Sequence, residues 1–349
     1  MGSTGKLNIS DTEQETLLDV PAPADENNTQ QIKKQRDPKK RPFYSKPKFK
    51  MYVFIFSLII IPLLNFLVFW VYVSFDTVLL TFQKFSVRTG EYEWVGFANY
   101  GEVFRDYIFG IGNAYPEKQQ IFLNSLHAIA INLIILPLSF IAAYAFFKKV
   151  PMEKYFRVCF YLPSIISISV LTICFRNLFH GDFGPIKMLF AKLGFEPVWL
   201  SADSEQMWTL IYIFCIWAGL STNVIMMNSA MMRIPSDISD YTKLEGVGFW
   251  REAVTIVLPL TLPTIGIYMI SVITSVFGFA LQPMLIADNY GTNNKFLTIA
   301  WKILADTAGG RQNDMILSST LGISLTLLLT PFVILVRWLV NRFTPEVDF

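Results

Sequence analysis

The stretch that decides the fold runs from Val254 to Ile286 and reads VTIVLPLTLPTIGIYMISVITSVFGFALQPMLI. It contains no Asp, Glu, Lys or Arg, and it exceeds the roughly 20 residues that an α-helix needs to cross about 30 Å of hydrocarbon. A charge at the centre of a spanning helix costs about 2.5–3.5 kcal/mol. An uncharged run of this length therefore indicates a membrane span.

Five further apolar runs are long enough to cross a membrane. They cover residues 51–75, 121–147, 157–179, 207–232 and 315–340. The whole chain is 53% hydrophobic and only 16% charged, whereas soluble domains carry about 25% charged residues. We therefore predict an all-α membrane protein with six transmembrane helices. Prolines inside the runs predict kinks or breaks, and they are Pro62, Pro137, Pro163, Pro259, Pro263 and Pro331.

Positive charge gathers in segments that join alternate spans. Short loops rich in Lys and Arg remain in the cytoplasm, so these segments are expected on that side, with both termini. Residues 76–120, 180–206 and 287–314 are then expected outside. The basic residues flanking the spans are Lys148, Lys149, Lys154, Arg157, Arg233, Lys243, Arg251, Arg337 and Arg342.

The ends of the chain differ from the apolar middle. Residues 1–43 are polar and are expected to form a disordered cytoplasmic tail, followed by a transmembrane domain over 44–342 and a short cytoplasmic tail over 343–349. Residues 31–50 are strongly basic. This run is expected to anchor the chain to membrane lipid rather than to bind nucleic acid, because a span follows directly.

The segment 234–250, between the fourth and fifth spans, carries the most specific pattern. It reads IPSDISDYTKLEGVGFW. Pro235 can open a short helix whose first N–H groups Ser236 or Asp237 could cap. The spacing of Ile238, Tyr241 and Leu244 suits one docking face, and two glycines then allow the chain to turn.

This segment resembles the EAA loop of the permease subunits of bacterial ABC importers, in which an E-A-A triplet precedes a glycine and then a Leu-Pro pair. The matching positions are Asp240 for the first Glu, Tyr241 and Thr242 for the alanines, Glu245 for the usual Asp, Gly246 for the glycine, and Leu258-Pro259 for the pair.

Other segments resemble the carbohydrate-uptake branch, which includes maltose and glycerol-phosphate permeases. The resemblance covers about residues 51–342, although Asp288–Gly291 replaces the usual Gly-Gly-Pro turn. The matching segments are Trp94–Tyr100, Asp182–Ile186 with Leu193-Gly194, Ile216-Trp217 with Gly219, and Ile234-Pro235.

The resemblance implies a permease of the type I ABC importer fold in a bacterial plasma membrane. It implies a second homologous permease, two copies of an ABC ATPase and an extracellular solute-binding protein as partners. ATP and Mg would bind to the ATPase, with no cofactor or metal in this chain. The residues that would couple to the ATPase are Asp240, Leu244, Glu245, Gly246 and Gly248.

A solute pathway is expected where neutral polar groups share a helix face inside the membrane. Hydroxyl and amide groups beside aromatic rings suit a sugar or oligosaccharide. Small polar residues also line tight helix contacts, so packing is the alternative for each one. The candidates are Ser271, Thr274, Ser275 and Gly278 in the fifth span, Trp217 and Thr222 in the fourth, and Ser164 in the third.

Alternative functions differ in the chemistry that they need. The ABC permease could carry a polyol, a phosphodiester or a peptide instead of a sugar. A membrane glycosyltransferase would need acidic or His residues clustered at one membrane face, and an ion-driven carrier would need ionisable residues inside a span. The sequence favours neither, and it lacks the phosphate-binding loop of an ATPase, so we expect a non-catalytic subunit.

Overall fold

The computed structural model describes residues 47–111, 116–181, 183–194, 207–287 and 295–343. The chain separates into two compact units, Met1–Val71 and Tyr72–Phe349. The expected tail 1–43, residues 344–349 of the expected carboxy-terminal tail, and the turn 288–291 lie outside the described residues.

The described part of the first unit, residues 47–71, is a single apolar helical segment. Helix α2 (Pro47–Asn65) continues as the π-helical η2 (Phe66–Tyr72), and none of the side chains described in this unit is buried. A helix that exposes apolar side chains on all sides needs lipid or another apolar surface around it. This property agrees with a membrane span.

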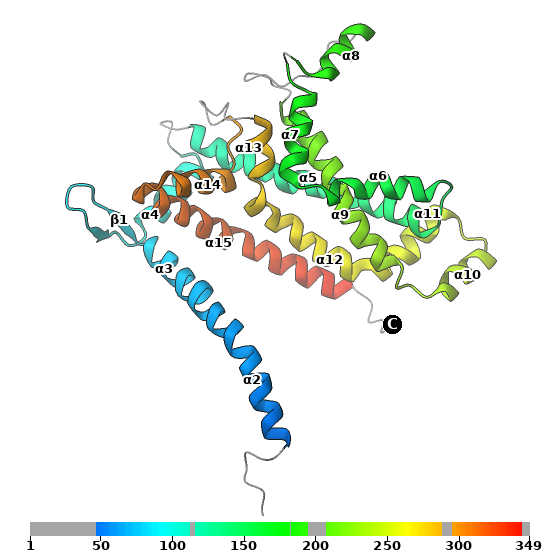
Figure 1. Ribbon diagram of the computed structural model, residues 1–349, viewed down its shortest axis with the longest axis horizontal. Helices are drawn as coiled ribbons and strands as arrows, with labels where there is room; N and C mark the ends of the chain where they lie inside the picture. Colours follow the sequence, from blue (N-terminus) through cyan, green and yellow to red (C-terminus); the bar gives the residue numbers. More distant parts are fainter. Residues whose placement is uncertain (1–46, 112–115, 182, 195–206, 288–294, 344–349) are drawn as a thin grey trace, which may run out of the picture. The chain divides into compact units, whose positions relative to one another are not determined.

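Where the structure describes it, the second unit is mostly helical, with one small hairpin (Figure 1). Its elements are α3 (Val73–Leu80), β1 (Gln83–Phe85), β2 (Tyr92–Trp94), α4 (Ala98–Glu102), η3 (Val103–Ile108), α5 (Pro116–Phe147), α6 (Glu153–Ile165), α7 (Ile168–Leu178), α8 (Pro185–Leu193), α9 (Met207–Met231), α10 (Ser236–Leu244), α11 (Phe249–Glu252), η4 (Ala253–Val257), α12 (Leu258–Thr274), η5 (Ser275–Gly278), α13 (Leu281–Ala287), α14 (Ile299–Gly309) and α15 (Gln312–Phe343).

The predicted membrane class is confirmed. Across the described residues, five helical stretches are long and apolar enough to cross a membrane, and a bent pair of helices makes a sixth candidate. The stretches are Met51–Leu80, Glu117–Phe147, Met207–Met231, Phe249–Gly278 and Gln312–Phe343, and the pair is Glu153–Ile165 with Ile168–Leu178. Each of the six predicted apolar runs falls on one of these candidates.

The third candidate span is broken rather than continuous. Helices α6 and α7 meet at an angle of 106°, where Ile166 adopts an extended backbone. The break follows Pro163, which has no N–H to donate. The next amide, that of Ser164, donates instead to Ser221 Oγ of α9 at 3.0 Å. Hydrogen bonding to a neighbouring helix is how broken helices are tolerated at membrane depth.

The fifth predicted run, 254–286, is not one continuous span. The helical stretch begins earlier, at Phe249, and ends at Gly278 after the 3₁₀ turn η5. Helix α13 is a separate element that packs on α7 and α9. Arg176 Nη1 of α7 donates to the Leu285 carbonyl of α13 at 3.4 Å, which joins these two short helices.

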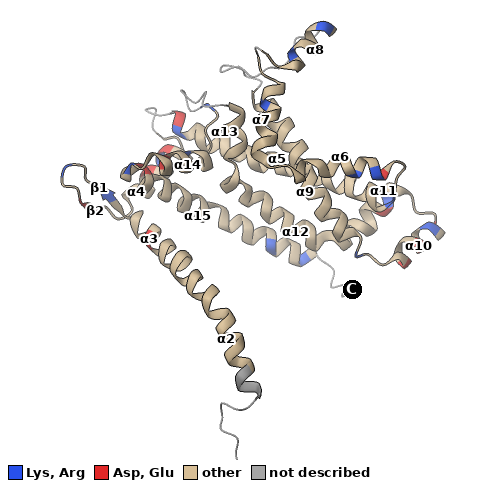
Figure 2. Ribbon diagram, viewed as in Figure 1, with Lys and Arg blue, Asp and Glu red and all other residues tan. Residues whose placement is uncertain are grey.

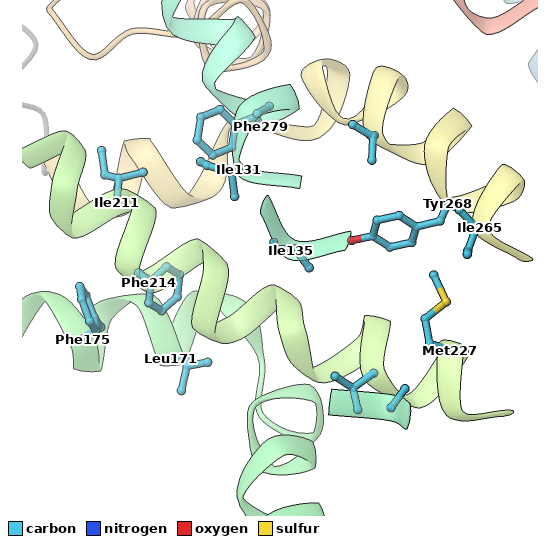
Figure 3. Packing of buried hydrophobic residues seen from close by; sticks show 14 of the residues in the cluster. Ile131, Ile135, Leu171, Phe175, Ile211, Phe214, Met227, Ile265, Tyr268 and Phe279 are labelled. Carbon is cyan, nitrogen blue, oxygen red and sulfur yellow. The ribbon is translucent and has the colours of Figure 1, made fainter. Parts of the chain in front are cut away.

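The main core lies where α5, α7, α9 and α12 meet (Figure 3). Phe214 and Ile211 of α9 and Leu171 and Phe175 of α7 are buried together there. Figure 3 shows Tyr268 reaching from α12 toward α5. The long helices are therefore held together by side-chain packing as well as by the short connections between them.

Two amide side chains of α15 join the hairpin to this helix, since Gln312 Oε1 accepts from the Tyr92 hydroxyl at 2.9 Å and Asn313 bonds the backbone of β1. Strands β1 and β2 pair antiparallel, with Gln83 opposite Trp94. Asn313 Oδ1 accepts from the Phe85 amide, and Asn313 Nδ2 donates to the Phe85 carbonyl, both at 3.0 Å. The Asn313 side chain thus replaces a neighbouring strand at the edge of β1.

Charged side chains concentrate at the two ends of the long helices of the second unit (Figure 2). One end holds α10 and the connections 148–153 and 232–252, and we name it the α10 end. The other holds the hairpin, η3 and α14, and we name it the hairpin end. Such an arrangement leaves an apolar middle, as a membrane requires.

Candidate functional site

The predicted helix in segment 234–250 is confirmed as α10, Ser236–Leu244. Its N-cap is Pro235, and no side chain caps it, so the expected capping by Ser236 or Asp237 is wrong. Proline at this position needs no cap for its own missing N–H, and the remaining N–H groups lie in an exposed first turn that water can reach.

Helix α10 ends at a left-handed glycine. Gly246 has φ of +65°, and the Val247 amide then donates to the Thr242 carbonyl at 3.0 Å. Residues other than glycine avoid this conformation because the Cβ approaches the carbonyl oxygen. The turn predicted at Gly246 is present. Gly248 has φ of −67° and caps α11 in an extended conformation that any residue can adopt.

Helix α10 has two unlike faces. Thr242 is buried and Ile238 packs against the core, whereas Tyr241 is 63% exposed and Leu244 is 87% exposed. The predicted docking face of Ile238, Tyr241 and Leu244 is therefore wrong for Ile238, which faces the bundle. Tyr241 and Leu244 form an exposed apolar pair, which is unusual on a short polar helix and indicates a contact surface.

The charges on α10 are mostly exposed. Asp240 Oδ1 accepts from Lys243 Nζ at 2.7 Å, and both side chains are open to solvent. This hydrogen bond holds the pKa of Asp240 below its ordinary value. Glu245 and Gly246 are exposed as well. The predicted coupling residues Asp240, Leu244, Glu245 and Gly246 thus lie together on the open side of one loop.

A buried ion pair anchors this loop to the second span. Lys148 Nζ, just after α5, lies 2.7 Å from Glu252 Oε2 of α11. Tyr144 of α5 donates its hydroxyl proton to the Phe249 carbonyl at 3.0 Å. The sequence analysis missed this anchor because Lys148 and Glu252 are far apart along the chain. The one indication in the sequence was Glu252 itself, because an acidic residue at the start of an apolar run needs a partner when it is buried.

A cavity of about 240 Å³ lies within the apolar middle, between α5, α7, α9 and α13. Asn132, Thr222 and Gln282 bring neutral polar groups to it, beside Gly219 and Phe279. Among the described residues, no donor reaches Gln282 Oε1, although this atom is buried. A polar atom buried without a partner needs an explanation, and a ligand hydroxyl could supply the missing proton.

The predicted pathway residues divide between several places. Thr222 lines the cavity. Trp217 lies on α9 but lines a different, apolar hollow with Phe175 and Leu171. Ser164 is exposed beside the break of the third span. Asn132 and Gln282 were missed, because isolated amides inside apolar runs carry no pattern of their own.

The predicted face of the fifth span is open to the outside of the chain. Ser271 and Thr274 are exposed and Ser275 is half-buried, and each hydroxyl donates to a carbonyl of its own helix. Gly278 ends the 3₁₀ turn η5 and is exposed. The structure does not bring these four residues to the cavity. Whether they line a solute pathway stays a prediction.

Residues 135–348 match the family described as the inner membrane component of binding-protein-dependent transport systems. The chain belongs to this family. The resemblance seen in segment 234–250 is thereby confirmed, and the matched region contains α10, the buried anchor residues and most of the cavity lining. Family membership makes this transport component a multi-pass protein of the plasma membrane, with a transport role rather than an enzymatic one.

Individual relatives of this transport component have low sequence identity to it but align with most of its length. The probable ABC transporter permease YurN of Bacillus subtilis is 23% identical over 235 residues, which are 66% of this chain and 77% of the relative. The arabinooligosaccharides transport permease AraP of the same organism is 24% identical over 294 residues, which are 82% and 87% of the two chains.

A solved structure supports the permease fold of this transport component. A chain of a bacterial ABC transporter involved in the import of the acidic polysaccharide alginate superimposes with a TM-score of 0.71 at 17% identity. The superposition covers 85% of this chain and 98% of that chain. The predicted permease fold is thus confirmed along most of its length.

Proposed function

We propose that this chain is the transmembrane subunit of an ATP-driven importer of a sugar or oligosaccharide. The observation that carries the proposal is the exposed pair Tyr241 and Leu244 on α10, next to the left-handed Gly246. A separate ATPase would hold this helix, and ATP and Mg would bind to that ATPase. The family supports the coupling, and the arabinooligosaccharide relative supports the cargo.

The α10 end would face the cytoplasm, as would both chain termini. The support is the basic residues at that end, which include Lys148, Lys149, Arg251 and Arg342. The hairpin end would then face the exterior, where a solute-binding protein delivers the cargo. The family description names dependence on such a binding protein.

A second permease would complete the membrane part. The exposed hydroxyl residues Ser271 and Thr274 of α12 support this partner, because polar groups seldom face lipid. Two copies of the ATPase would then serve two coupling helices. The solute would pass between the two permeases.

The buried anchor gives the coupling a mechanical route. The outer face of α10 would follow the ATPase, while Lys148 bound to Glu252 would transmit its displacement to the end of α5. Helix α5 also lines the cavity through Asn132. A movement of α10 would therefore reach the groups that surround the solute.

The cavity chemistry favours a neutral hydroxylated cargo. The cavity offers both hydrogen-bond donors and acceptors, from Asn132, Thr222 and Gln282. Its lining contains no Asp, Glu, Lys, Arg or His. Phe279 adds an aromatic ring, against which a sugar ring can pack. A charged peptide or phosphodiester would require a fixed opposite charge.

The test is uptake into proteoliposomes that contain this chain with its partner permease, ATPase and binding protein. ATP-dependent uptake of labelled oligosaccharides is expected. Leu244→Asp should abolish uptake, since a carboxylate would enter an apolar contact, whereas the volume-conserving Leu244→Met should retain it. Uptake of polyols or peptides but not of sugars would contradict the proposal that the cargo is a sugar. Full uptake by the Leu244→Asp variant would contradict the proposal that α10 couples the permease to the ATPase.

A further inference from the structure

A second hollow, of about 490 Å³, lies behind α10 at the α10 end of the bundle. It is bounded by the end of α5, the start of α6, the end of α9 and the side of α10 that carries Ser239, Asp240 and Lys243. We name it the rear pocket. Its size falls within the range of small-molecule sites, and it is separate from the cavity in the apolar middle.

The rear pocket carries an excess of positive charge. Four basic side chains line it, those of Lys148, Lys149, Arg157 and Lys243. Three of them are paired with carboxylates, Lys148 with Glu252, Arg157 with Glu153 and Lys243 with Asp240, so the excess is the one charge of Lys149. Among the described residues, Lys149 makes no ion pair. Such a lining favours an anion, and guanidinium and ammonium groups together suit a phosphate.

A buried amide in the same pocket lacks its partner. Asn228 of α9 is only 5% exposed, and no donor among the described residues reaches its Oδ1. Its Nδ2 contacts only Met232 Sδ, at 3.7 Å, which is a weak acceptor. Arg157 Nε also has no acceptor among the described residues, although Arg157 Nη2 binds Glu153 at 2.7 Å. The pocket thus offers an acceptor for a hydroxyl and a donor for an anion.

We propose that the rear pocket binds a phosphate ester that also carries a hydroxyl group. The phosphate would contact Lys149 and Arg157, and the hydroxyl would donate to Asn228 Oδ1. Two sources share this chemistry: the headgroup of an anionic phospholipid such as phosphatidylglycerol, and a soluble phosphorylated polyol or sugar.

Occupancy of the pocket would act on α10. Ser236, Ser239 and Lys243 of α10 line one side of the pocket, and α5 and α6 line the other. A bound anion would therefore join α10 to the ends of two spans. This consequence for coupling rests on the proposed function, whereas binding itself does not.

The binding test uses the purified full chain without its partners, so its outcome is independent of sugar transport. In one arm, glycerol 3-phosphate is titrated into the chain in phosphatidylcholine nanodiscs by calorimetry. In the other arm, native mass spectrometry measures phosphatidylglycerol retained from nanodiscs that contain both lipids. Saturable binding of the soluble ester supports a soluble ligand, and selective retention supports a lipid.

The variants make the test specific to the pocket. Lys149→Gln and Asn228→Leu should each weaken binding about tenfold, the value of one charge-assisted or buried hydrogen bond. Lys154→Gln removes an exposed cation at the start of α6 that does not line the pocket, and binding should be unchanged. If neither ligand binds, or if Lys154→Gln weakens binding as much as Lys149→Gln, the site is overturned. Lys149 is exposed, so its variant remains informative even if Asn228→Leu fails to fold.

Discussion

Lys148 Nζ contacts both carboxylate oxygens of Glu252, at 2.7 and 2.9 Å, and joins the end of the second span to the start of the fifth. The Glu252 side chain is only 5% exposed. A buried pair of this kind holds two segments in one arrangement, because separating its members leaves a charge without a partner. The pair therefore fixes the base from which α10 projects.

Glu252→Ala should destabilise the chain by about 3 kcal/mol, because Lys148 is left largely buried and unpaired. The free energy of unfolding in mixed micelles measures this change. Glu153→Ala is the matched control, since the Glu153–Arg157 pair is more exposed and should cost at most about 1 kcal/mol. The double variant Lys148→Met with Glu252→Leu should recover most of the loss. Equal effects of the two single variants would contradict a structural role for the pair.

Gly246→Ala should loosen the end of α10 by about 1 kcal/mol, because alanine is strained at φ of +65°. No atom lies within 4 Å of a Cβ added there, so the effect comes from the backbone alone. Hydrogen exchange at the Val247 amide should accelerate about fivefold. Gly248→Ala also meets no atom and has an ordinary φ, so exchange should stay unchanged. Faster exchange at the Val247 amide in Gly248→Ala than in Gly246→Ala would contradict the assignment of the backbone strain to position 246.

Thr222→Val and Gln282→Leu should each raise the KM of uptake by up to about tenfold, since each removes one hydrogen-bonding group from the cavity. Ser229→Ala removes a hydroxyl from α9 outside the cavity and should leave KM unchanged. Initial rates at graded sugar concentrations in proteoliposomes measure the change. A normal KM in both cavity variants would exclude the cavity from solute binding.

Acid should loosen the contact between η3 and α5. Asp106 accepts hydrogen bonds from Arg105 at 2.7 Å and Lys118 at 2.9 Å, and Arg105 contributes most to lowering the pKa of Asp106. A lowered pKa in the folded state stabilises the fold above the ordinary pKa, and this contribution disappears as the pH falls through the lowered value. Thermal midpoints between pH 6 and 3 should therefore drop less in Asp106→Asn than in the unmodified chain. An identical drop in both would contradict the prediction.

The sequence was sufficient for features that depend on neighbouring residues. Uncharged runs predicted the spans, since insertion into hydrocarbon depends on local composition. Pro235 and Gly246 predicted the limits of α10, because each restricts the backbone at its own position. These effects are local, and the folded structure retains them.

Contacts between segments far apart in the chain could not be predicted from the sequence. The bend of 106° between α6 and α7 depends on Ser221 of α9, which accepts from Ser164. The inward position of Ile238 depends on where the core lies, and helical spacing alone could not give it. Gln282 and Asn132 belong to one cavity only because α13 folds back beside α5 and α9.

The proposed transport mechanism requires that an ATPase binds the exposed face of α10. A photoactivatable amino acid at Leu244, in membranes that contain the complete transporter, tests this contact directly. The same substitution at Leu193 of α8, another exposed leucine, is the control. We expect a crosslink from position 244 to a nucleotide-hydrolysing chain and none from position 193. Absence of that crosslink at position 244 in a complex active in ATP-dependent uptake would contradict the account.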